Sequence, residues 1–138
     1  YLVERADRLH FAAHGLVDER QPELSGLLLT PTGGADDDGL LQVYEIFNLE
    51  LSADLVVLSA CDTALGKNVR GEGLLGVSRA FLYAGAASVA VSLWQVADTS
   101  TSELMVRFYS HLMASGDKAE ALRLSKLELI QEGQYDHP

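Results

Sequence analysis

The chain has 138 residues, of which 48% are hydrophobic and 22% are charged, as is typical of one globular domain. Ten Lys and Arg against twenty Asp and Glu give a formal net charge of −10, which argues against direct binding to nucleic acid or an anionic membrane surface. No apolar run approaches the roughly 18 residues of a membrane span. The single cysteine, Cys61, excludes an internal disulfide framework or a multi-cysteine zinc site and fits a reducing, cytoplasmic location. The first residue is Tyr1 and no signal peptide follows, so we expect the true N-terminus elsewhere.

Three short apolar runs predict buried strands. They cover Leu9–Ala13, Leu55–Ala60 and Ala87–Leu93. Between the first two lies a turn-rich polar stretch, Pro31–Gly39, which we expect to be a mobile surface loop.

Helical spacing follows each of the two later strands. Asp117, with Glu120 three residues on, predicts the N-terminus of a last helix that continues to about Ile130. The residues expected to turn towards a core in the two earlier helices are Leu74, Leu75, Phe81 and Leu82, and then Leu104, Met105, Phe108, Tyr109 and Leu112.

Alternation of strands and helices predicts an α/β fold with a mostly parallel sheet, whose ligand site lies at the carboxyl ends of the strands. His14 and Cys61 each follow an apolar strand directly, so both should emerge at that edge. A thiol beside an imidazole becomes the thiolate that attacks a carbonyl, and the same imidazole can protonate the leaving amine. The backbone N–H groups of Gly15 and Cys61 are candidates to stabilise the oxyanion. A lone cysteine after a strand is also commonly an inert buried thiol, and we expect His10, deeper in the same strand, to be structural.

Several ordered motifs resemble the CHAT domain family, relatives of caspases and separases that are often attached to tetratricopeptide repeats. The motifs are His10-Phe11-Ala12-Ala13-His14-Gly15, Leu55-Val56-Val57-Leu58-Ser59-Ala60-Cys61-Asp62-Thr63, Gly71-Glu72-Gly73, Ala84-Gly85-Ala86-Ala87-Ser88-Val89, Ser92-Leu93-Trp94-Gln95-Val96-Ala97-Asp98, and then Thr101, Leu104-Met105 and Phe108-Tyr109. The resemblance spans nearly the whole chain. It implies a caspase-like three-layer α/β sandwich and a Cys–His dyad.

The resemblance implies a cysteine endopeptidase with His14 as base and Cys61 as nucleophile, acting without a cofactor or metal on a protein or peptide substrate. The separase pattern suggests that Asp98 lies near the S1 pocket, where an acid favours a basic P1 residue. Trp94 is a second candidate substrate-binding residue, as a pocket wall. Asp98 equally fits a cap of the next helix, and Trp94 fits a core residue. The full-length chain is expected to carry tetratricopeptide repeats or another regulatory segment.

Two departures limit the comparison with caspases. The sequence around Cys61 lacks the Gln-Ala-Cys-x-Gly signature of caspases, so specificity for aspartate is not carried over. Only about three strands are expected where the caspase-like sheet has around six, so residues 1–138 are interpreted as an incomplete, C-terminal part of the domain that lacks the first strands and the final one.

Other interpretations remain open. Gly71-Glu72-Gly73-Leu74-Leu75-Gly76 fits the dinucleotide-binding G-x-G-x-x-G pattern but does not begin directly after a strand. The stretch from Lys67 to Gly73 suits a loop that gates the substrate or is rearranged on activation. The main alternative function is a catalytically silent caspase-like domain that regulates or binds other proteins.

Overall fold

The structure is a computed structural model that describes residues 2–18, 20–34, 38–59, 61–62, 72–92 and 97–133. The chain divides into two compact units, Tyr1–Gln95 and Val96–Pro138.

A three-stranded parallel sheet forms the centre of the first unit. Its order is β1 (Arg8–Phe11), β5 (Leu55–Leu58) and β7 (Val89–Val91), with β5 in the middle. All four residues of β5 are buried, as expected for a strand covered on both faces of a parallel sheet. The predicted α/β fold with a parallel sheet is therefore confirmed, and each of the three predicted strands overlaps an observed one.

A second sheet, which the sequence did not predict, has four short strands in the order β4 (Leu40–Gln42), β3 (Gly26–Leu28), β2 (His14–Leu16) and β6 (Cys61–Asp62). The pairs β2–β3 and β3–β4 are antiparallel, whereas β2–β6 is parallel. The expectation of only about three strands was too low, because two- and three-residue strands leave no periodicity in the sequence.

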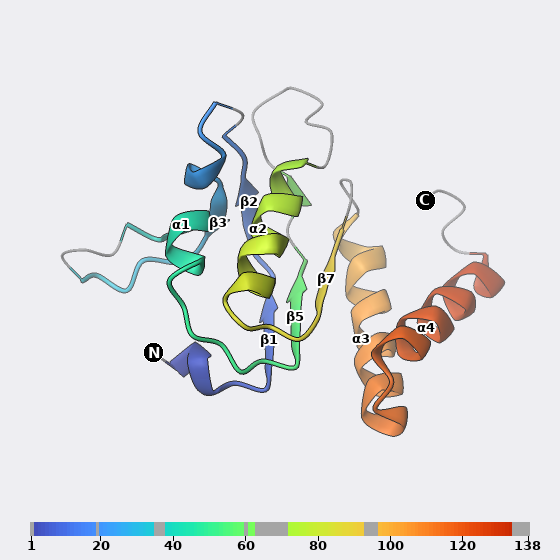
Figure 1. The fold of residues 1–138 in the computed structure, drawn as a ribbon. Coiled ribbons are helices and arrows are strands. Elements are labelled where there is room, and N and C mark those ends of the chain that lie inside the picture. Colours follow the sequence, from blue (N-terminus) through green and yellow to red (C-terminus); the bar gives the residue numbers. More distant parts are fainter. Residues whose placement is uncertain are drawn as a thin grey trace. The chain divides into compact units, whose positions relative to one another are not determined.

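One face of the parallel sheet is covered by helices. Figure 1 shows α2 (Glu72–Tyr83) in front of the strands, with α1 (Val43–Ile46) beside it. The ring of Phe81 in α2 lies with its centroid 5.3 Å from that of Phe11 in β1. Short 3-10 turns at Leu2–Arg5 and Pro22–Leu24 complete the described elements of this unit.

The buried side of α2 differs in part from the prediction. Phe81 is fully buried as predicted, but Leu75 and Leu82 are 39% and 48% exposed. The buried apolar residues on this side are Val77, Ala80 and Phe81 of α2 and Ala84 directly after it. This i, i+3, i+4, i+7 set is rich in small side chains, which let the helix pack closely on the sheet, so the larger leucines turn outwards.

The second unit is a helical hairpin of α3 (Asp98–Ser115) and α4 (Lys118–Glu132). Phe108 and Leu112 are buried as predicted, whereas Leu104, Met105 and Tyr109 are only half-buried. The facing helix contributes Ala121, Ser125 and Leu129.

The predicted cap of α4 is confirmed. The side chain of Asp117 accepts a hydrogen bond from the Glu120 N–H at 3.0 Å, which satisfies a donor that the first helical turn leaves unpaired. The helix extends to Glu132, two residues beyond the predicted end.

Candidate functional site

The two strand pairs β1–β5 and β2–β6 share one register. Arg8 pairs with Leu55 and Phe11 with Leu58 in the first, and His14 pairs with Cys61 in the second, a separation of 47 residues in every pair. Two residues separate β1 from β2 and two separate β5 from β6. The chain therefore passes from the first pair of strands to the second without a register shift.

This register makes His14 and Cys61 direct partners across parallel strands. Neighbouring strands lie about 4.8 Å apart, so the backbones of the two residues are adjacent at the end of the parallel sheet. The residue His14 is exposed, and Gly15 beside it is buried. The catalytic roles of His14 and Cys61 stay a prediction.

Gly15 lies in the middle of the second sheet. It pairs with Leu27 of β3 on one side and with Asp62 of β6 on the other. Peptide N–H groups of a strand with two neighbours are directed in the plane of the sheet. The Gly15 N–H can stabilise an oxyanion only if it points towards a substrate bound at the end of β6. The oxyanion role of the Gly15 and Cys61 N–H groups stays a prediction.

His10 makes a contact that the sequence analysis did not find. Its Nε2 atom lies 2.8 Å from Oγ of Ser59. Neighbouring protein atoms partly desolvate the His10 imidazole and so lower its pKa, which favours the neutral ring. Ser59 comes two residues after Val57, the ladder partner of His10, and so lies on the same face. The sequence leaves this register unmarked, because Leu55–Leu58 is apolar on both faces.

Asp98 and Trp94 are the proposed substrate-binding residues. Asp98 belongs to the second unit, where it is the first residue of α3. The N-cap of that helix is Ala97, so the interpretation of Asp98 as the cap is wrong, although a carboxylate in the first turn still interacts favourably with the helix dipole. Trp94 lies outside the described residues, and the S1 role of Asp98 stays a prediction.

The glycine pattern does not come directly after a described strand. Gly73 and Gly76 are inside α2, which begins at Glu72, and the last described strand residue before this helix is Asp62. A dinucleotide fingerprint begins immediately after its strand, so the described residues argue against the Rossmann interpretation. Of the proposed gating loop from Lys67 to Gly73, the part before Glu72 lies outside the described residues, and the last two residues are helical.

Neither a metal centre nor a membrane segment is found in the described part of the chain. Within it, no three His, Cys, Asp or Glu residues cluster in a way that would hold a metal ion. No helix among the described residues is both long and apolar enough to cross a bilayer.

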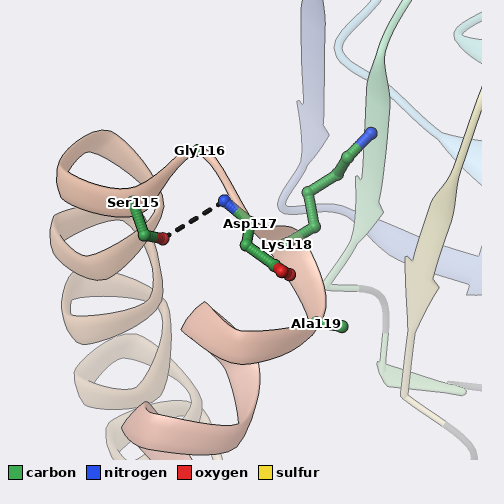
Figure 2. Close-up of a pocket in the computed structure, with 5 residues that line it drawn as sticks. All are labelled: Ser115, Gly116, Asp117, Lys118 and Ala119. Atoms are coloured by element: carbon green, nitrogen blue, oxygen red, sulfur yellow. Dashed lines mark hydrogen bonds between the residues drawn. The ribbon is translucent and has the colours of Figure 1, made fainter.

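An open depression lies at the turn between α3 and α4. It is lined by Ser115–Ala119, and Figure 2 shows the Asp117 N–H donating to the Ser115 hydroxyl inside it. These polar groups cap and close a helical turn, and no predicted site residue takes part.

A family model of the CHAT domain matches residues 2–138. The chain belongs to the CHAT domain family. Tetratricopeptide repeat protein 28 of Mus musculus is 38% identical to this CHAT domain over 100 residues, and the protein of the same name from Homo sapiens is 35% identical over 100 residues. Each match covers 72% of this chain but 4% of the relative, so the CHAT domain corresponds to a small part of the relatives it matches.

Proposed function

We propose that this CHAT domain is a cysteine endopeptidase in which His14 activates Cys61. The observation that carries the proposal is the parallel pairing of these two residues at the end of the central strands. Residues at one register position share a face of the sheet, and a general base must lie within hydrogen-bond reach of the proton that it takes.

The proposed reaction has two steps. His14 accepts the thiol proton of Cys61, and the thiolate attacks the carbonyl carbon of the scissile peptide bond. The tetrahedral oxyanion is stabilised by peptide N–H groups, for which Gly15 and Cys61 are the candidates. Collapse breaks the C–N bond, and the protonated His14 donates its proton to the leaving amine. Water then hydrolyses the thioester, which releases the acid product and restores the thiol.

The proposed substrate is a protein with a basic residue at P1. Asp98 is the proposed partner of that residue, with Trp94 as a pocket wall, because a carboxylate attracts a cationic side chain. The proposal includes a cytoplasmic location, since a reducing compartment keeps the single Cys61 as a thiol. Because both relatives are named as tetratricopeptide repeat proteins, we propose that such repeats in the parent chain regulate the domain.

The extent of the peptidase domain in the parent chain is a further part of the proposal. Within the described residues, β1 and β7 are the outer strands of the parallel sheet. Open edges of this kind are normally paired or covered. We propose that residues 1–138 form the CHAT peptidase domain together with further strands of the parent chain on these edges.

A peptide electrophile tests the proposed function. The full-length protein is treated with a peptidyl ketone that carries arginine at P1, or with the matched aspartate compound, and the adduct is located by mass spectrometry. We expect the arginine compound to modify Cys61, and modification to fall by about 100-fold in His14→Ala but not in His111→Ala, a histidine of α3. Weaker labelling in Asp98→Asn supports the S1 assignment.

Two outcomes contradict the proposal. If Cys61 is labelled equally in His14→Ala and in the parent protein, His14 does not act as the base that activates the thiol. Lack of labelling by either compound, with and without the repeats of the parent chain, favours the silent interaction domain.

A further inference from the structure

Ser59 is bound to β1 by two hydrogen bonds. Its N–H donates to the Phe11 carbonyl oxygen at 2.9 Å, and its Oγ lies 2.8 Å from Nε2 of His10. The first bond continues the ladder between β1 and β5, whereas the second joins the side chains of two residues that are 49 positions apart in the chain.

These bonds lie at the break between β5 and β6. β5 ends at Leu58 and β6 begins at Cys61, and the ladder partner of Cys61 is His14. A strand that slips by one residue moves every following side chain to the opposite face. Such a slip after Leu58 would remove Cys61 from its place opposite His14. β6 has only two residues and so offers little resistance of its own.

We propose that the His10–Ser59 pair is a positioning device that holds the strand break in register, so that Cys61 stays opposite His14. Neither side chain takes part in the reaction. The catalytic consequence rests on the proposed function, whereas the structural consequence, a fixed β2–β6 pairing, does not.

The pair suits this task chemically. A neutral imidazole has one N–H donor and one acceptor nitrogen, and a hydroxyl group can donate or accept. The contact therefore forms with either tautomer of His10. Thr can replace Ser59 with retention of the hydroxyl group, whereas Ala removes it.

The test uses the full-length protein with the variants Ser59→Ala, His10→Gln, the double variant, and Ser59→Thr. Ser88→Ala is the matched control, because the Ser88 hydroxyl donates to the Asp54 carbonyl at 2.6 Å on another part of the same sheet. Two quantities are measured in each: the second-order rate of Cys61 alkylation by iodoacetamide, with its pH profile, and amide hydrogen exchange of residues 61–62.

We expect Ser59→Ala and His10→Gln each to slow alkylation at pH 7 by about tenfold, equivalent to about 1.4 kcal/mol, and to speed exchange at residues 61–62. The double variant should be no slower than either single variant, because each removes the same interaction. Ser59→Thr should restore the rate, and Ser88→Ala should leave rate and exchange unchanged.

Unchanged exchange at residues 61–62 in both single variants overturns the proposal, as does an additive loss in the double variant. A lower unfolding temperature with unchanged alkylation and exchange also overturns it, since that describes a purely structural bond. If alkylation of the parent protein does not depend on His14, the proposed function fails, and the exchange measurement alone then decides on the positioning role.

Discussion

Two histidines four residues apart have different partners. His10 contacts the Ser59 hydroxyl, whereas His14 lies opposite Cys61 in the next ladder. The sequence indicated that His14 and Cys61 share one sheet edge, because each follows an apolar run. It did not indicate the His10–Ser59 contact, since Leu55–Leu58 is apolar on both faces and such a strand leaves its register unmarked.

At the residue scale, Gly85 is expected to tolerate no side chain. Its φ is +112°, and a Cβ atom would collide with the carbonyl oxygen of Leu51. We predict that Gly85→Ala lowers the free energy of unfolding by about 2 kcal/mol or more. Urea denaturation measures the loss.

Gly116→Ala is the matched control for Gly85→Ala. Gly116 has φ of +73°, but nothing lies within 4 Å of the position that a Cβ atom would take there. A left-handed backbone costs about 1–2 kcal/mol for a residue other than glycine, partly offset by a gain of about 0.4–1 kcal/mol from the less flexible unfolded chain. Equal losses in the two variants would show that the contact with Leu51 is unimportant.

At the element scale, the relative position of β2 and β6 is set by the register that they share with β1 and β5. The two helices of the second unit are joined by paired side chains. β2 and β6 are too short to fix a register by their own hydrophobic pattern. In the helical hairpin, Arg107 of α3 donates to both carboxylate oxygens of Glu132 of α4, at 2.8 and 2.7 Å. Each feature gives a prediction.

An engineered disulfide tests the register. With Cys61 as the single native cysteine, His14→Cys places a second thiol at its register partner. Adjacent strands bring Cα atoms to about 4.8 Å, within the range of about 4.4–6.8 Å that a disulfide spans. We predict that mild oxidation yields an intramolecular disulfide, seen as a loss of two mass units.

Leu16→Cys is the control variant, because it places a second thiol on the same strand but not at the register partner of Cys61. It lies two residues further along β2, so its Cα should be too far from that of Cys61 for a disulfide. Equal disulfide formation in the two variants, or formation in Leu16→Cys alone, would contradict the observed pairing.

The Arg107–Glu132 pair predicts a pH dependence of stability. Its hydrogen bonds hold the pKa of the Glu132 carboxyl below its usual value. Because the folded pKa is depressed, the stabilisation is present above the unfolded pKa of about 4.3 and is lost as pH falls through the folded value. We predict that Glu132→Gln lowers the urea midpoint at pH 7 and that the difference from the parent protein shrinks progressively as the pH falls below about 4.3.

The variant Glu50→Gln, at an exposed position in the first unit, is the control. It should leave the midpoint nearly unchanged at both pH values. A difference for Glu132→Gln that persists unchanged at pH 3 would exclude the ion pair as its cause.

At the scale of the whole molecule, the sequence predicted the parallel sheet and the long helices, and it missed what depends on tertiary context. Leu55–Ala60 was recognisable because a buried parallel strand is continuously apolar, whereas β1, at an edge of the sheet, alternates exposed and half-buried residues. The three-residue strand Leu40–Gln42 was not, because it is formed by pairing with β3 and carries no pattern of its own. Outward-facing Leu82 was misassigned because neighbouring Phe81 and Ala80 fill the space against the sheet.

The pH dependence of Cys61 alkylation by iodoacetamide, in the parent protein and in His14→Gln, tests the central claim most directly. We predict that at pH 7 the parent protein reacts about 10- to 30-fold faster, because only about 3% of a thiol with the ordinary pKa of about 8.5 is ionised at that pH, and that the rate in His14→Gln rises only near that pKa. Superimposable profiles would show that His14 does not activate Cys61 and would contradict the account.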